Sequence, residues 1–127
     1  MKEIQLHQYH LPGGWTILAG KTDLDNDELS LRIAKQNDTW FHVRGLPGSH
    51  VILHSDHPDR PGRAQLKTAA AVAAWHSKAR KGGKVPVVYT LAKYVSKPGK
   101  AEPGTVNIRN EKCLIVKPQL PVTNGDP

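Results

Sequence analysis

The chain contains little cysteine, few aromatic residues and no long apolar run. Its 127 residues include one Cys, one Met, one Phe, three Trp and three Tyr. A single cysteine, Cys113, excludes an internal disulfide and a zinc site built from several thiolates. No stretch approaches the roughly 20 apolar residues that a transmembrane helix requires. We therefore expect one soluble domain with an ordinary apolar core, no membrane partner, and Cys113 as a small buried residue of a strand.

Motifs of the common catalytic and cofactor sites are also missing. The sequence has no HExxH motif and no Walker-type loop. Its seven His are scattered, whereas zinc requires three or four convergent ligands. Ser49 and His50 are adjacent, and adjacent strand residues point to opposite faces, so they are poorly placed as nucleophile and base. We expect no catalytic residue, no cofactor and no metal.

Positive charge is concentrated in the second half of the chain. The formal net charge is +7 at pH 7. Residues 1–59 contain five Lys and Arg against eight Asp and Glu, whereas residues 60–117 contain thirteen against two. This asymmetry indicates a surface that binds a polyanion. The first residues, MKEIQLHQYHLPGG, are too polar for a secretory signal, so we expect a cytoplasmic protein.

Periodicity predicts an α+β fold with a mainly antiparallel sheet, one long Ala-rich helix and one short helix. The long helix is expected over residues 63–80, where Leu66 and four alanines recur at helical spacing. Lys78, Arg80 and Lys81 would then lie in its last turn, where cations also complement the helix dipole. Trp75 points away from the alanine stripe, either as an exposed stacking platform or packed under the N-terminal strands. The short helix is expected to begin near Asp25.

Alternating patterns predict the strands. They are expected at residues 3–9, 15–19, 39–54 (a hairpin), 85–90, 91–95, 105–108 and 113–116. No internal repeat or linker indicates a second domain. We assign residues 1–118 to a single domain and residues 119–127 to a flexible tail.

The stretch WFHVRGLPGSHVIL, residues 40–53, is the most informative part of the sequence. Two apolar strands flank a Gly-Pro-Gly turn, and alternation divides their side chains into two rows. One row comprises Phe41, Val43, Val51 and Leu53, and the other comprises Trp40, His42, Arg44, His50, Ile52 and His54. If the aliphatic row is buried, the other row forms an open face suited to stacking bases and holding phosphates. Alternatively, Trp40 is core and the histidines are structural. Gly48 and Ser49 suit a phosphate-binding turn of outward N–H groups or simply a tight turn.

The same stretch resembles the signature of the NFACT-R domain, the RNA-binding module of RqcH/NEMF-type ribosome quality-control factors. Further matches continue in order and extend the resemblance over residues 15–118. They include Gly20-Lys21, Asn26-Asp27, Ser77-Lys78-Ala79-Arg80, Val87-Val88-Tyr89-Thr90, Lys93, Val95-Ser96-Lys97-Pro98 and Val116-Lys117-Pro118. Large family members also carry an N-terminal tRNA-binding domain and a long coiled coil. These 127 residues contain neither, so peptide-tail elongation on the ribosome is not expected of this sequence.

The leading hypothesis is a non-catalytic RNA-binding module that is linked to translation or ribosome quality control. The expected partner is tRNA or rRNA, in the second case on the ribosomal large subunit. The predicted nucleic-acid-binding residues are Trp40, His42, Arg44, Gly48, Ser49, His50, Lys78, Arg80, Lys93 and Lys97. One alternative is a protein-interaction module that docks on the ribosome or on rescue factors. Another is a small-ligand enzyme that uses His42 and His50.

Overall fold

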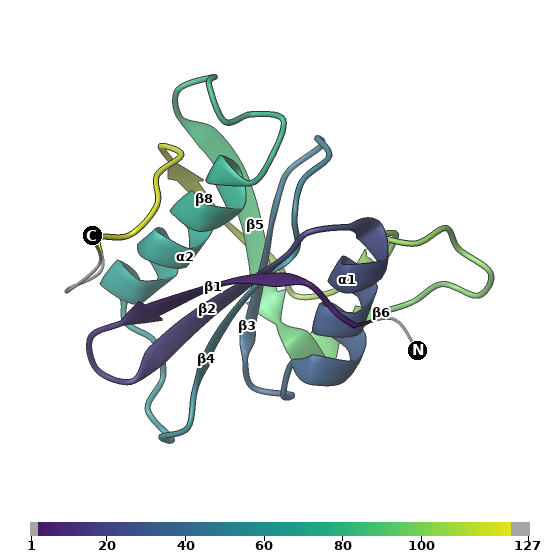
Figure 1. The fold of residues 1–127 in the computed structure, drawn as a ribbon, viewed down its shortest axis with the longest axis horizontal. Helices are drawn as coiled ribbons and strands as arrows, with labels where there is room; N and C mark the ends of the chain where they lie inside the picture. Colours follow the sequence, from purple (N-terminus) through teal and green to yellow (C-terminus); the bar gives the residue numbers. More distant parts are fainter. Residues whose placement is uncertain (1–2, 123–127) are drawn as a thin grey trace.

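The computed structural model describes residues 3–122, in which the alternating segments form one six-stranded sheet (Figure 1). Across the sheet, the strands follow the order β1 (Leu6–Leu11), β2 (Trp15–Gly20), β4 (Val51–Ser55), β3 (Thr39–Val43), β5 (Val85–Leu91) and β8 (Lys112–Val116). All neighbouring strands are antiparallel. A separate short pair joins β6 (Val95–Ser96) to β7 (Asn107–Ile108). The predicted α+β class with a mainly antiparallel sheet is confirmed.

Helix α2 (Arg63–Trp75) covers one face of the sheet (Figure 1). Its alanine stripe lets the helix backbone approach the strands closely, and Ala69, Ala70, Ala73 and Ala74 are fully buried. They pack in one apolar core with the aliphatic row of the hairpin, in which Phe41 and Val51 have no exposed surface. The predicted burial of this row is confirmed.

The other face of the hairpin is also covered, which the sequence analysis did not anticipate. Helix α1 (Asp23–Glu28) and the π-helical turn η1 (Leu29–Ile33) lie on it. There a second, smaller core forms from Leu29, Trp40, Ile52, Val88 and Val95. Helix α1 begins after Thr22 rather than Asp25, because the Thr22 hydroxyl accepts the backbone N–H of Asp25 at 3.1 Å while the Asp25 carboxylate accepts the Thr22 N–H. The predicted open face is therefore wrong.

Three smaller predictions also need correction. Helix α2 ends at Trp75 instead of residue 80, so Lys78, Arg80 and Lys81 do not lie in its last turn. Residues 91–95 do not form a strand, because a 3₁₀ turn, η2 (Ala92–Tyr94), interrupts them. Cys113 is exposed rather than buried, because it lies on the face of β8 opposite to Leu114 and Val116, which pack in the core under α2.

The C-terminal segment crosses α2 rather than leaving the domain. The backbone N–H of Gln119 donates to the carbonyl of Ala71 at 3.2 Å. Leu120 and Pro121 are half-buried. The remainder of the predicted tail, residues 123–127, lies outside the described residues. Within the part of the chain that is described, no helix is long and apolar enough to span a membrane.

Candidate nucleic-acid interface

Trp40 and His50 belong to a buried polar cluster beneath α1 and η1. Trp40 is 2% exposed and His50 is 3% exposed. The Trp40 indole N–H donates to the Ser30 hydroxyl at 2.9 Å, and Ser30 Oγ lies 2.8 Å from His50 Nδ1. The backbone N–H of His50 donates to Asn26 Oδ1 at 3.0 Å. Neither ring can stack on a base while these contacts hold, so the two residues support the fold.

His42 lies at the border of this cluster. Its ring is stacked near Trp40, with centroids 6.0 Å apart, and meets His50 edge to face at 5.4 Å. Burial lowers the pKa of His42, and burial together with neighbouring His42 lowers the pKa of His50 to about 4. Both rings are therefore neutral at physiological pH and provide no cation for a phosphate.

Gly48 and Ser49 connect the hairpin loop to the chain that follows α2. The backbone N–H of Ser49 donates to the carbonyl of His76 at 2.9 Å, and the Lys78 N–H donates to the carbonyl of Pro47 at 3.0 Å. A Cβ atom on Gly48 would lie 2.7 Å from the Ser77 Cβ, so only glycine fits this approach. The Ser49 hydroxyl donates to the carbonyl of Gly20 at 2.6 Å. These donors face other parts of the protein, so the predicted phosphate cradle of outward N–H groups is wrong.

This pairing also explains the early end of α2. The His76 carbonyl and the Lys78 N–H, which a longer helix would use internally, bond to the 47–49 segment instead. The pairing redirects the basic residues that follow Trp75 to the side of the hairpin loop. A depression of about 450 Å³ lies there, between the end of α2, the hairpin loop and the start of α1. We call it the basic groove.

The floor of the basic groove carries stacked aromatic rings. His7 from β1 stacks on His76 with ring centroids 4.2 Å apart, and the Tyr9 hydroxyl lies 2.7 Å from His76 Nε2. Burial lowers the pKa of His76 to about 4, with His7 and Arg80 adding to the effect. Burial and nearby Lys21 lower the pKa of His7. At physiological pH the floor therefore presents neutral, flat rings.

Cations line the same groove. Lys21, Lys78 and Arg80 are exposed lining residues, and Asp23 is the one carboxylate among the groove's described lining residues. The Arg80 guanidinium lies 3.8 Å from the centroid of the Trp75 ring, which is half-buried. This contact holds the guanidinium and the indole together at the end of α2. The groove thus combines three cations, an amphipathic indole and neutral imidazoles.

The ten predicted binding residues do not converge on one site. Gly48, Ser49, Lys78 and Arg80 line the basic groove, whereas Trp40, His42 and His50 form the cluster beneath α1 and η1. Arg44 is exposed at the end of β3, in the hairpin loop. Lys93 and Lys97 lie elsewhere, in η2 and just after β6. Lys97 Nζ donates to Asp27 Oδ2 at 2.9 Å and to the carbonyl of Glu102 at 2.6 Å, so its charge is already paired.

Sequence reasoning missed His7 and His76 as lining residues, and gave Lys21 no binding role. The signal for Lys21 was present, because Gly20-Lys21 is one of the segments that match the family pattern. For the two histidines no local signal exists, because the contact joins residues 69 positions apart and depends on the docking of β1 beside the end of α2. Within residues 3–122, no group of three or more His, Cys, Asp or Glu is arranged to hold a metal ion.

Comparison with known proteins gives a consistent result. The model of the NFACT protein RNA binding domain matches residues 5–110. The chain is 39% identical over 113 residues to the Rqc2 homolog RqcH of Bacillus subtilis, and 42% identical over 106 residues to the protein of that name from Streptococcus suis. These alignments cover 89% and 84% of this chain, but 19% of each relative.

A solved structure is similar as well. The C-terminal part of the fibronectin/fibrinogen-binding protein from Streptococcus suis superposes with a TM-score of 0.86 at 39% identity, over 94% of this chain and 47% of that one. The chain therefore spans about half of that solved chain and about a fifth of the curated relatives. On the extent of the family match and these identities, the chain belongs to the NFACT protein RNA binding domain family.

Proposed function

We propose that this domain is a non-catalytic RNA-binding module that takes tRNA or rRNA at the basic groove. The observation that carries the proposal is the convergence of Lys21, Lys78 and Arg80 around an aromatic floor, in a domain whose family is described by RNA binding. The similarity to RqcH proteins favours a role in ribosome quality control, and a cytoplasmic location follows from that role.

The groove suits two kinds of contact with RNA. Lysine and arginine side chains neutralise phosphates, and release of counterions makes that part of the affinity dependent on salt. An unpaired base can stack on the face of the Trp75 indole that the Arg80 guanidinium does not cover, as bases commonly do on aromatic side chains in RNA recognition. Arg80, in contact with the same ring, can bind the phosphate that flanks such a base.

The hairpin signature acts by positioning these groups rather than by touching RNA throughout. Gly48 and Ser49 hold residues 76–78 in place, and Ser49 also fixes Gly20, which precedes Lys21. Arg44 stays a proposed phosphate contact, since it is exposed at the rim of the hairpin loop. Lys93 is exposed too and stays a proposed peripheral contact, whereas the ion pair of Lys97 argues for a structural role.

The salt dependence of binding tests this proposal. Fluorescence anisotropy of labelled tRNA and of labelled rRNA fragments should give a steep log–log slope, with about 0.7–0.9 contributed by each neutralised phosphate. Lys78→Ala should weaken binding and lower the slope by about that amount. The matched control is Lys35→Ala, because Lys35 is an exposed lysine outside the basic groove. A flat slope, or no binding at micromolar protein, contradicts the proposal.

A further inference from the structure

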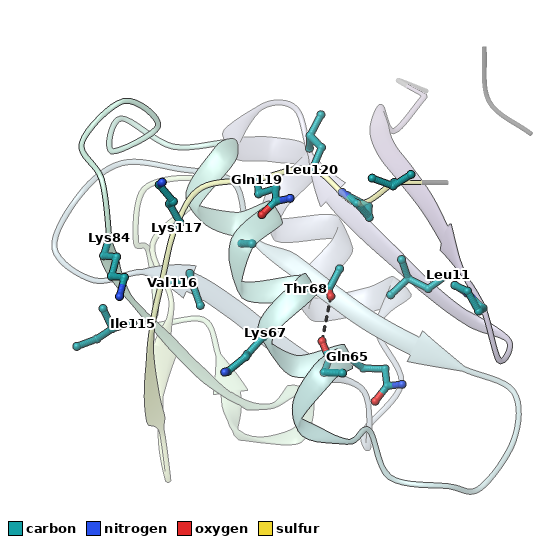
Figure 2. A pocket seen from close by; sticks show the side chains of 15 residues that line it. Leu11, Gln65, Lys67, Thr68, Lys84, Ile115, Val116, Lys117, Gln119 and Leu120 are labelled. Atoms are coloured by element: carbon teal, nitrogen blue, oxygen red, sulfur yellow. Dashed lines mark hydrogen bonds between the residues drawn. The ribbon is translucent and has the colours of Figure 1, made fainter. Parts of the chain in front are cut away.

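A second, larger hollow lies toward the other end of α2. It has a volume of about 670 Å³ and is bounded by the first two turns of α2, the end of β8, the β1–β2 turn and the segment that follows residue 118 (Figure 2). The basic groove uses residues 75–80, whereas this hollow uses residues 64–71 of the helix. The two hollows therefore share no lining residue. We call the second one the aliphatic groove.

The walls of the aliphatic groove are apolar without being aromatic. Leu11, Ile115 and Val122 line it, and the last two are 68% and 89% exposed. Figure 2 shows Ile115 projecting from the end of β8 beside Lys84. None of the described lining residues is aromatic, so the groove has no plane on which a base could stack. Exposed aliphatic side chains around one hollow indicate a surface that can bind protein.

The charges around the aliphatic groove have one sign. Lys67, Lys84 and Lys117 are exposed lining residues, and no Asp or Glu occurs among the lining residues that the structure describes. In Figure 2, Lys84 and Lys117 lie on the same side of the groove as Ile115, away from Leu11, and Lys67 projects from α2 between the two sides. An aliphatic surface beside lysines is complementary to a segment that carries both aliphatic and acidic side chains.

The same side of the groove ends at the edge of the sheet. Among residues 3–122, strand β8 pairs with β5 alone. Ile115 lies opposite Pro86, which has no N–H, and the Pro86 carbonyl accepts the Arg44 N–H from the β3 side. Since opposite residues alternate between bonded and non-bonded pairs in an antiparallel ladder, Ile115 and Cys113 direct their backbone N–H and C=O groups away from β5. These groups can pair with an added strand.

We propose that β8 and the aliphatic groove bind an acidic, aliphatic segment of another protein in extended conformation. The segment adds a seventh strand beside β8, its aliphatic side chains contact Ile115 and the groove, and its carboxylates pair with Lys84 and Lys117. This site is independent of the RNA proposal, because it shares no lining residue with the basic groove.

Panning of a phage-displayed random decapeptide library on the full chain tests the site. Enriched peptides should combine Asp or Glu with Val, Ile or Leu. Their affinity should fall at least tenfold with Ile115→Lys, and at least tenfold with the double variant Lys84→Glu/Lys117→Glu. The matched control Lys35→Glu should leave it unchanged. A synthetic peptide with Lys in place of its acidic residues should bind the double variant better than it binds the wild type.

A second experiment tests whether the peptide pairs with β8 as an added strand. N-methylation of the peptide amides that face β8 should abolish binding, whereas methylation of the intervening amides should not, because only alternate residues of an added strand pair with the edge. The proposal is wrong if the enriched peptides lack this composition, or if their affinity is unchanged by Ile115→Lys and by Lys84→Glu/Lys117→Glu. If Lys84→Glu/Lys117→Glu instead weakens binding of a 20-nucleotide oligouridine while no peptide is enriched, the groove belongs to RNA and the proposal is wrong.

Discussion

Trp40 and Trp75 each lie among histidines, yet only the cluster around Trp75 is accessible. Trp40 lies with His42 and His50 under α1 and η1, whereas Trp75 lies with His76 beside Arg80 at the end of α2. The first tryptophan is 2% exposed and donates its N–H to Ser30; the second is half-buried and contacts a guanidinium. Similar residue types therefore serve stability in one place and are available to a ligand in the other. The two clusters differ because α1 and η1 cover the Trp40 cluster, whereas the Trp75 cluster lines the basic groove.

The largest expected contrast is in folding stability. Trp40→Ala removes a fully buried ring and leaves Ser30 and His50 without its contacts, so the free energy of unfolding should fall by about 3–5 kcal/mol. Trp75→Ala should cost clearly less, because its ring is only half-buried and its main polar contact is with Arg80. Denaturant unfolding of both variants measures the difference. Equal losses would remove the distinction between the two clusters.

The second contrast concerns pH and His50. Ser30 Oγ accepts the Trp40 N–H and lies 2.8 Å from Nδ1 of the buried His50 ring. The lowered pKa of about 4 means that the unfolded chain binds the second imidazole proton of His50 more tightly than the folded chain does. Stability is then fully present above about pH 6.5 and falls as the pH drops toward 4, by about 3 kcal/mol from this group.

Unfolding experiments between pH 7.5 and 4.5 measure that loss. His50→Gln should flatten the profile relative to wild type, even if it lowers stability at neutral pH. His76 also has a pKa lowered to about 4, so His76→Gln should flatten it as well, and the two effects should add because the rings are not in contact. His10→Gln, at an exposed position in β1, serves as the control. An unchanged profile in His50→Gln would contradict the buried, neutral assignment.

Local sequence patterns predicted the α2-covered half of the domain well. The alanine repeat identified the helix, and strand alternation identified Phe41 and Val51 as buried. Alternation states which side of a strand a residue occupies but not whether that side is covered. Trp40 is covered by α1 and the short π-helical turn η1. The apolar pattern of that turn spans too few residues to predict which part of the sheet it packs against.

The candidate site was predictable only in part. The charge pattern identified Lys78 and Arg80 as binding residues, but it did not predict that they line the groove. The helical spacing of the sequence continues past Trp75 toward residue 80 and therefore placed them in a longer helix. The chain leaves the helix there because Gly48 permits a close approach to Ser77. A bridge between segments about 29 residues apart gives no periodic signal in either segment. Cys113 illustrates a similar limit, since its exposure depends on which face of β8 packs in the core under α2.

We expect RNA to contact the cluster around Trp75 and not the one around Trp40. Intrinsic tryptophan fluorescence during a tRNA titration tests it most directly, because a base stacked on an indole quenches its emission. We predict that wild type and Trp40→Phe both show quenching, and that Trp75→Phe loses most of it while remaining folded. Quenching that persists in Trp75→Phe and disappears in a folded Trp40→Phe would contradict the account.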